Sequence, residues 1–316
     1  MNTSEDGCAA SSGPPERAPA AGGQRRRVLI ISNPVAGRRR SLRLRRVAAH
    51  LVGLGAEVTL RQTARRGDAE AFAAQVLPGS TDVIAVAGGD GTINEVLNGL
   101  NPPSPPIAII PLGTANVLAI EVGLSLRPRE IAAAIACGEA SPIRLGTANG
   151  RRFVMMLGIG FDAEVVRRVG PRLKRVAGRG GYVAQSLLAA FSFPRRRYTV
   201  RIDGAGYDAA SLVIANGRSY AGRYTCAPEA RLDQPTLEVC LFRDGGSAAA
   251  LTYMAALAAG RLHRLRLVEI VRASRVRVDG PPGEPVQADG DIALSLPLDI
   301  AVDPLPVALI GGSGRA

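Results

Sequence analysis

The chain has 316 residues, of which 47% are hydrophobic and only 4% aromatic, with no Trp. This length allows two medium-sized domains with cores of their own, and the shortage of aromatic rings argues against the stacking surfaces that bind single-stranded nucleic acid. The formal net charge of +12 suits an anionic partner, and with nucleic acid disfavoured the remaining candidates are phosphates and an anionic membrane surface.

The chain begins with 24 residues rich in Ala, Gly, Ser and Pro, which we expect to form a disordered tail rather than a signal peptide. Residues 25–144 alternate apolar β-rich runs with helical patterns, which predicts a parallel sheet covered by helices. The expected strands are 27–32, 57–62, 82–87 and 107–111, and the expected helices are 42–54, 68–76, 92–100, 115–121 and 129–137.

From residue 145 to 303 the sequence changes to short β-like runs separated by turns, which predicts a β-sandwich domain. The expected strands are 152–157, 198–203, 212–216, 237–242, 265–271, 275–278, 286–288 and 298–302, with helices at 182–191 and 247–259. Residues 304–316 form a C-terminal segment that can return to the first domain. The longest apolar stretch, 248–259, is shorter than the roughly 20 residues that a membrane-spanning helix needs, so we expect a cytoplasmic protein.

The sharpest motif is Gly88-Gly-Asp-Gly-Thr92, which joins an apolar strand directly to a helix. Glycines let a phosphate approach the backbone, and the N–H groups at the start of a helix complement its negative charge. Asp90 within the loop is then placed to contact a magnesium ion or the reacting hydroxyl. The alternative is a tight turn that is capped by Asp90 and Thr92.

Two further loops follow strands of the same predicted sheet. Asn33-Pro-Val-Ala-Gly37 comes after the first strand, and Pro111-Leu-Gly-Thr-Ala-Asn116 comes after the buried fourth strand. Doubly wound sheets bind their ligands at the carboxyl ends of the strands, where these loops are expected to meet. Asn-Pro and Gly are also routine turn residues, so the first of the two loops indicates little on its own.

The lysine and cysteine positions argue against lysine-dependent phosphate sites and against a cysteine metal site. Lys174 is the only lysine, whereas Walker-type phosphate loops and protein kinases each need a lysine at a fixed position. Cys8, Cys137, Cys226 and Cys240 are widely separated and lack the spacing of a metal site. The four cysteines are therefore interpreted as reduced thiols.

Taken together, these motifs resemble the diacylglycerol kinase catalytic domain family, which includes bacterial lipid kinases and the sphingosine and ceramide kinases. Asn33-Pro-x-x-Gly37, Gly88-Gly-Asp-Gly-Thr92, Pro111-Leu-Gly-Thr-Ala-Asn116 and Gly158-Ile-Gly-Phe-Asp162 follow in the family's order and spacing, within residues 27–309. The resemblance implies an α/β domain and a β-sandwich domain, with ATP and a lipid meeting in the cleft between them.

The resemblance also implies roles for particular residues. The ATP site would be lined by Asn33, Pro34, Val35, Ala36, Gly37, Thr63, Gly88, Gly89, Asp90, Gly91, Thr92, Ile93, Asn94, Glu95, Thr114 and Asn116. Asp291 matches a glutamate that is often assigned as the general base, although sphingosine-type members credit the loop aspartate, here Asp90. Asp162 matches an aspartate that contacts the lipid head group, and a turn-capping role is the alternative.

The sequence departs from the family at three positions that are commonly acidic, which carry Val117, Arg144 and Gln234. The last follows Asp233, where many bacterial members have a structural magnesium site, so the acidic network around magnesium is reduced. Mg²⁺ remains expected with ATP, since the nucleotide phosphates can supply most of its ligands with Asp90 as a carboxylate. Arg144 is open to two interpretations, as a positive charge near the nucleotide or as a solvated or salt-bridged side chain.

The sequence thus predicts an ATP-dependent lipid kinase that acts on a diacylglycerol, sphingoid base or ceramide in phospholipid or other lipid metabolism. A basic cluster would give peripheral contact with anionic membrane, and it comprises Arg167, Arg168, Arg172, Lys174, Arg175, Arg179 and Arg195 to Arg197. Two alternatives stay open: a soluble-substrate kinase such as an NAD kinase, and a catalytically weak nucleotide-binding protein at the membrane. A homodimer also stays open.

Overall fold

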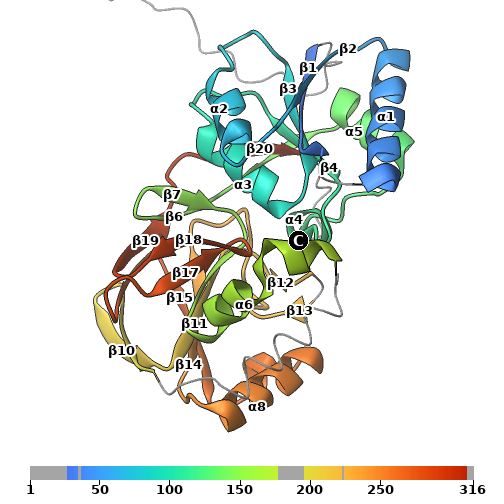
Figure 1. Cartoon of the computed structure of the whole chain (residues 1–316). Helices are drawn as coiled ribbons and strands as arrows, with labels where there is room; N and C mark the ends of the chain where they lie inside the picture. Colours follow the sequence, from blue (N-terminus) through green and yellow to red (C-terminus); the bar gives the residue numbers. More distant parts are fainter. Residues whose placement is uncertain (1–26, 35–36, 177–195, 223, 312–316) are drawn as a thin grey trace, which may run out of the picture.

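The computed structural model describes residues 27–34, 37–176, 196–222 and 224–311, and for 37–40 and 169–176 it describes the backbone alone. Figure 1 shows an α/β domain above a β-rich domain, with helix α8 at the far end of the second domain. The fold class predicted from the sequence is confirmed.

The first domain is built on a six-stranded sheet in the order β2-β1-β3-β4-β20-β5. All neighbouring pairs are parallel except β20 with β5. The strands are β1 (Arg27–Ser32), β2 (Glu57–Gln62), β3 (Val83–Gly88), β4 (Ile107–Pro111), β5 (Ala140–Ile143) and β20 (Val307–Ile310). Strand β20 therefore brings the end of the described chain into the first sheet (Figure 1).

Helices cover both faces of this sheet (Figure 1). They are α1 (Gly37–Gly53), α2 (Asp68–Ala74), α3 (Asp90–Gly99), α4 (Val117–Glu121) and α5 (Pro128–Cys137). Val28 and Ile30 of β1 pack in a core with α1 and α5, whereas Leu29 and Ile31 pack in the core of α2 and α3. Burial on both faces explains why β1, β3 and β4 are continuous apolar runs rather than alternating ones.

The second domain packs two six-stranded antiparallel sheets face to face, in the orders β10-β9-β16-β19-β6-β7 and β15-β14-β11-β8-β17-β18. The first sheet comprises β6 (Gly146–Ala148), β7 (Arg151–Phe153), β9 (Tyr198–Ile202), β10 (Ala205–Ala209), β16 (Arg275–Asp279) and β19 (Leu298–Val302). The second comprises β8 (Met156–Ile159), β11 (Ser211–Ala215), β14 (Leu237–Phe242), β15 (Val268–Ala273), β17 (Pro285–Ala288) and β18 (Asp291–Ser295).

Short elements complete this domain: β12 (Ser219–Tyr220), β13 (Tyr224–Thr225), α6 (Phe161–Val176), α8 (Ser247–Ala258) and a 3₁₀ turn at Leu262–Arg264. Phe153 and Tyr198 are fully buried in the core between the sheets. The outer face of the β8–β11–β14 sheet contributes Val213 and Cys240 to the same hydrophobic cluster as Leu29 and Ile31 of the first domain. The two domains thus share apolar packing.

The structure corrects one predicted strand, and one predicted helix lies outside the described residues. Residues 152–157 do not form one strand, because β7 ends at Phe153 and β8 begins at Met156, in different sheets. The backbone N–H groups of residues 154–156 instead donate to one carboxylate, that of Asp289. The helix predicted at 182–191 lies outside the described residues.

Candidate active site

Three loops meet at the carboxyl ends of β1, β3 and β4. The Asn33 N–H donates to the Ala87 carbonyl at 3.0 Å, and the Leu112 N–H donates to the Gly88 carbonyl at 2.9 Å. Thr63, which is buried, joins the β2 end to the same edge through its N–H and the Ser32 carbonyl at 2.9 Å. The structure therefore brings together loops that are separated by up to 80 residues, as their positions after parallel strands predict. Val35 and Ala36 lie outside the described residues.

The loop glycines are required by close packing as well as by any phosphate. A Cβ on Gly113 would lie 2.6 Å from the Gly89 Cα, and a Cβ on Gly88 would lie 2.6 Å from Thr92 Oγ1. Asn116 adopts a left-handed conformation with φ 49° and closes the third loop, because its side chain bonds both the N–H and the carbonyl of Gly113 at 2.7 and 3.0 Å. Thr114 is exposed beside them.

Helix α3 begins at Asp90, inside the Gly-Gly-Asp-Gly-Thr motif. The N–H groups of Thr92 and Ile93 both bond the Gly89 carbonyl, at 3.0 and 3.1 Å. The Ile93 side chain is buried in the core, and Glu95 accepts a 3.3 Å bond from the Ala69 N–H at the start of α2. The side chains of Ile93 and Glu95 thus contribute to the packing of α3, and their place in the nucleotide site stays a prediction.

Asp90 occupies the first turn of α3, and its Oδ1 accepts a 3.4 Å bond from the Leu118 N–H at the start of α4. Burial raises the pKa of Asp90 to about 6, and the nearby charge of Asp289 acts in the same direction, while the backbone N–H bonds lower it. A carboxyl group with this pKa is mostly ionised at pH 7 and can still accept a proton, as a general base must.

The second domain contributes a turn between β17 and β18 that lies against α3. Asp289 and Gly290 both have left-handed conformations, with φ 48° and 88°, and Asp291 follows at the start of β18. A Cβ on Gly91 would lie 3.1 Å from Asp291 Oδ2. The structure therefore brings the predicted base Asp291 beside the Gly-Gly-Asp-Gly-Thr loop, and Gly91 makes room for its carboxylate.

Asp289 is the residue that sequence reasoning missed. Its two oxygens accept bonds from the N–H groups of Val154 and Met155 at 2.8 Å and of Met156 at 3.1 Å, and from Asn94 Nδ2 at 2.8 Å. Burial raises the pKa of Asp289, whereas these donors lower it. The signal available in the sequence was an aspartate directly before a glycine, which often adopts a left-handed turn conformation.

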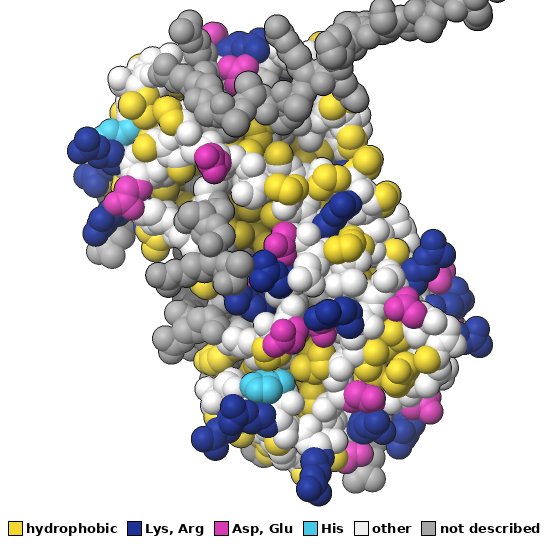
Figure 2. All heavy atoms as spheres, turned by 180° about the vertical axis from the view of Figure 1, so that it is seen from behind, with side chains coloured by type: hydrophobic (Ala, Val, Ile, Leu, Met, Phe, Trp, Pro, Cys, Tyr) yellow, Lys and Arg dark blue, Asp and Glu magenta, His cyan; other side chains and the backbone are white. Residues whose placement is uncertain are grey.

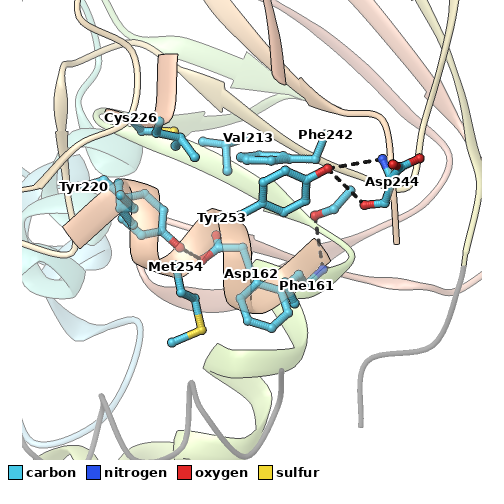
Figure 3. A pocket seen from close by; sticks show the side chains of 13 residues that line it. Phe161, Asp162, Val213, Tyr220, Cys226, Phe242, Asp244, Tyr253 and Met254 are labelled. Carbon is cyan, nitrogen blue, oxygen red and sulfur yellow. Dashed lines mark hydrogen bonds between the residues drawn. The ribbon is translucent and has the colours of Figure 1, made fainter. Parts of the chain in front are cut away.

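Asp162 lies at the start of α6 in the second domain, and its side chain is buried, with the residue 3% exposed. Its Oδ2 accepts a 2.6 Å bond from Gln287 Nε2, and its Oδ1 accepts a bond from the Tyr220 hydroxyl. Figure 3 shows Asp162 and Tyr220 meeting at the wall of a pocket. This position is compatible with the predicted contact to a substrate head group.

The pocket lies between helix α8 and the outer face of the sheet that contains β11 and β14 (Figure 3). Phe242 and Tyr253 pack edge to face within it, with ring centroids 4.9 Å apart. Its walls are mostly apolar and comprise Phe161, Asp162, Ser211, Val213, Tyr220, Cys226, Phe242, Asp244, Ala250, Tyr253, Met254, Leu257 and Leu262. Such walls suit a hydrophobic ligand with a polar group at the Asp162 end.

Asp233 and Arg144 lie at or beside positions that are commonly acidic in the family, and both are bonded within the protein. Both oxygens of Asp233 are bonded by Arg231, at 3.0 and 2.9 Å, and this arginine lowers the pKa of Asp233. Arg144 Nη1 donates to the Pro304 carbonyl. Across the described ranges there is no group of three or more His, Cys, Asp or Glu side chains that could hold a metal ion.

The predicted basic cluster is only partly described. Arg167 and Arg168 both pair with Glu164, and Arg196 pairs with Glu284. Arg179 and Arg195 lie outside the described residues, and so do the side chains of Arg172, Lys174 and Arg175. On the face shown in Figure 2, Arg side chains are mixed with Asp and Glu over the second domain. In the part of the chain that the structure describes, no helix is both long and apolar enough to cross a membrane.

Comparison with known proteins gives the family. Residues 27–148 match the model of the diacylglycerol kinase catalytic domain, and residues 155–311 match that of the YegS C-terminal NAD kinase beta sandwich-like domain. A protein named "Probable lipid kinase YegS-like" from Stenotrophomonas maltophilia is 30% identical over 82% of this chain and 90% of its own length. The chain belongs to the diacylglycerol kinase family.

A second related protein and a solved structure are similar to this chain along most of its length. A protein named "Diacylglycerol kinase" from Bacillus subtilis is 28% identical over 85% of this chain and 90% of its own length. The crystal structure of a diacylglycerol kinase from Bacillus anthracis superposes with a TM-score of 0.72 over 88% of this chain and 94% of that one, at 24% identity. The fold is therefore shared along both domains, and the family supports a kinase.

Proposed function

We propose that this family member transfers the γ-phosphoryl group of ATP to the hydroxyl group of a lipid. The observation that carries the proposal is the approach of Asp291 from the second domain to Gly91, at the N-terminus of α3. A carboxylate beside a glycine-rich helix start is suited to accept the proton of a hydroxyl that attacks a phosphate held there.

ATP would lie along the three loops at the sheet edge. Asn33, Gly89, Thr114 and Asn116 come from loops that are hydrogen-bonded to one another or in contact. The positive end of the α3 helix dipole and N–H groups of the glycine-rich loop would stabilise the phosphates. Magnesium would add positive charge at the phosphates, and Asp90 is the carboxylate of this loop that could contact it.

In the proposed transfer, the lipid hydroxyl oxygen forms a bond to the γ-phosphorus while the bond to the β–γ bridging oxygen breaks, which releases ADP. The hydroxyl proton passes to Asp291 or Asp90. The protein contributes mainly position and electrostatic stabilisation, as in other phosphoryl transfers. Both carboxyl groups stay candidates, because Asp291 lies near Gly91 and Asp90 has a pKa of about 6.

The substrate class is inferred from the pocket beside Asp162. Tyr253, Met254 and Leu257 of α8 and Phe242 of β14 would surround an acyl or alkyl chain, and Asp162 would bond a head-group hydroxyl. Such a substrate resides in membranes, so we propose a cytoplasmic enzyme of lipid metabolism that contacts anionic membrane peripherally.

The experiment offers radiolabelled ATP and Mg²⁺ with diacylglycerol, a sphingoid base or ceramide in mixed micelles. Asp90→Asn and Asp291→Ala are compared with Asp299→Asn, because the Asp299 carboxylate is exposed and paired with Arg277 far from the loops. We expect transfer to one lipid class, with a loss of at least about a hundredfold in one of the first two variants. No transfer to any lipid, or full activity in both variants, would contradict the proposal.

An NAD kinase-like activity is the second candidate, because the C-terminal family model is described by its likeness to the NAD kinase β-sandwich. The apolar walls of the pocket favour a lipid over NAD. Formation of NADP when NAD replaces the lipid in this assay would decide for the soluble substrate. Tight ATP binding without transfer to lipid or NAD would instead indicate a catalytically weak nucleotide-binding protein.

A further inference from the structure

Gln287 connects the pocket to the turn that carries Asp291. It lies on β17, 2% exposed, and both ends of its side-chain amide are bonded within the protein. Nε2 donates to Asp162 Oδ2 at 2.6 Å, and Oε1 accepts from the Gly290 N–H at 2.7 Å. The amide orientation is fixed, because the reverse orientation would face an NH₂ group to an N–H and an oxygen to a carboxylate.

The register of β17 against β8 places Gln287 so that its amide can bridge Asp162 and Gly290 through hydrogen bonds. Gln287 lies opposite Gly158 of β8, and a Cβ on Gly158 would lie 1.7 Å from Asp162 Oδ2. The Asp162 carboxylate therefore occupies the space above a glycine, within reach of the Gln287 amide. A buried acceptor and a buried donor that lose this bond would each remain unsatisfied, at a substantial cost.

The other end of the bridge acts on the turn. Gly290 has φ 88° and stands between Asp289, which holds Asn94 of α3, and Asp291, which lies beside Gly91. Fixing the Gly290 N–H fixes the direction in which the chain enters β18. We infer that Gln287 is a positioning residue that couples the substrate pocket at Asp162 to the Asp291 carboxylate, an inference that rests on the proposed function.

The coupling has a chemical consequence for specificity. A ligand hydroxyl that bonds Asp162 joins a chain of hydrogen bonds from Tyr220 through Asp162 and Gln287 to the Gly290 N–H. Substrates that bond Asp162 would then be phosphorylated while the Asp291 carboxylate is held in position to accept their proton. Ligands that fill only the apolar part of the pocket would gain affinity without this alignment.

The test uses two variants of different chemistry in the full chain. Gln287→Met removes both bonds at similar volume, and we expect kcat for the lipid to fall about tenfold to a hundredfold, with KM for ATP within about twofold. Gln287→Glu keeps the bond to Gly290 but sets two carboxylates against each other. The ratio of its kcat to that of the unchanged protein at the same pH should rise as the pH is lowered from 8 to 5.5, because a protonated Glu can again donate to Asp162.

A double variant that exchanges the charged and neutral side chains of positions 162 and 287 distinguishes a positioning role of Gln287 from a general loss of stability. In an Asp162→Asn background, Gln287→Glu restores a donor–acceptor pair with reversed direction, so it should lower neither kcat nor the free energy of unfolding relative to Asp162→Asn alone. Unchanged kcat in Gln287→Met, or equal losses from Gln287→Glu in both backgrounds, would overturn the inference. If the unchanged protein phosphorylates no lipid, the proposed function fails, and the pH-dependent unfolding of Gln287→Glu with and without Asp162→Asn still tests the bridge.

Discussion

Asn94 of α3 donates a 2.8 Å hydrogen bond to Asp289 of the β17–β18 turn, across 195 positions of sequence. The same carboxylate accepts the N–H groups of Val154, Met155 and Met156, where the chain passes between the two sheets of the second domain. One side chain therefore fixes the turn, the crossover and the nucleotide-loop helix relative to one another. The proposed active site depends on this contact, because Asp291 lies two residues further on.

Asp289→Asn should be strongly destabilising although it is nearly isosteric. Asn accepts the left-handed φ of 48°, but its NH₂ group must face N–H donors that now lack an acceptor. We expect the free energy of unfolding to fall by about 2 to 3 kcal/mol, measured by urea denaturation. Asp299→Asn, at an exposed ion pair, should cost less than about 1 kcal/mol. Equal losses in the two variants would refute the assigned role of Asp289.

Arg152 and its neighbour Arg151 provide a matched pair for the domain interface. Arg152 pairs with Asp303 at 2.7 Å, with side-chain exposures of 18% and 8%, and also donates to the Leu97 and Leu100 carbonyls. Arg151 pairs with Glu70 at exposures of 44% and 34%.

Arg152→Met should cost about 3 to 5 kcal/mol, because it leaves the Asp303 charge buried without its partner. Arg151→Met should cost less than about 1 kcal/mol, since water already screens that pair. Urea denaturation of the two variants gives the comparison, and a cost for Arg151→Met as large as that for Arg152→Met would show that burial does not govern the interface.

The pH dependence of stability should carry a signature of Asp90. Its pKa is about 6 in the folded protein and 3.8 in the reference state, so between these values the folded state binds more protons and stability falls as the pH rises. Relative to the unchanged protein, Asp90→Asn should therefore gain about 2 to 3 kcal/mol in the free energy of unfolding between pH 4 and pH 7.

Asp68 provides the control of opposite sign for this measurement. Backbone N–H groups of Arg65 and Ala64 lower the pKa of Asp68, so its contribution is present above pH 3.8 and is lost as the pH falls. The stability gap of Asp68→Asn should thus change only below about pH 4. A gap for Asp90→Asn that stays constant from pH 4 to pH 7 would contradict the raised pKa.

The strands predicted most accurately are those whose own residues form a clear apolar pattern. Strands β1, β2, β4, β14 and β19 have the predicted bounds. Four of them carry apolar side chains that are mostly buried on at least one face, a pattern visible without tertiary context. Strand β10 was missed because it lies at a sheet edge and exposes most of its residues, which leaves no apolar run to detect.

The site was predictable in its loops and less so in its contacts. Glycines between a strand and a helix indicated a loop at residues 88–92, but the sequence could not show that Asn94 would bond Asp289 of the second domain. That contact depends on a pairing between distant segments, and no local pattern encodes it. The division of residues 152–157 between two sheets has the same cause, because the carboxylate that stabilises the crossover comes from the β17–β18 turn.

Gly89 and Gly113 lie in contact where the second and third loops of the sheet edge meet. Gly113→Ala would place a Cβ 2.6 Å from both the Gly89 Cα and Asn116 Oδ1, and backbone cannot yield as a flexible side chain can. The two loops should separate, with a loss of about 1 to 3 kcal/mol in stability and about tenfold or more in ATP affinity, measured by calorimetry. Gly53→Ala, where a Cβ meets nothing within 4 Å, should leave ATP affinity unchanged. Normal ATP binding in Gly113→Ala would mean that the nucleotide does not lie across the two loops.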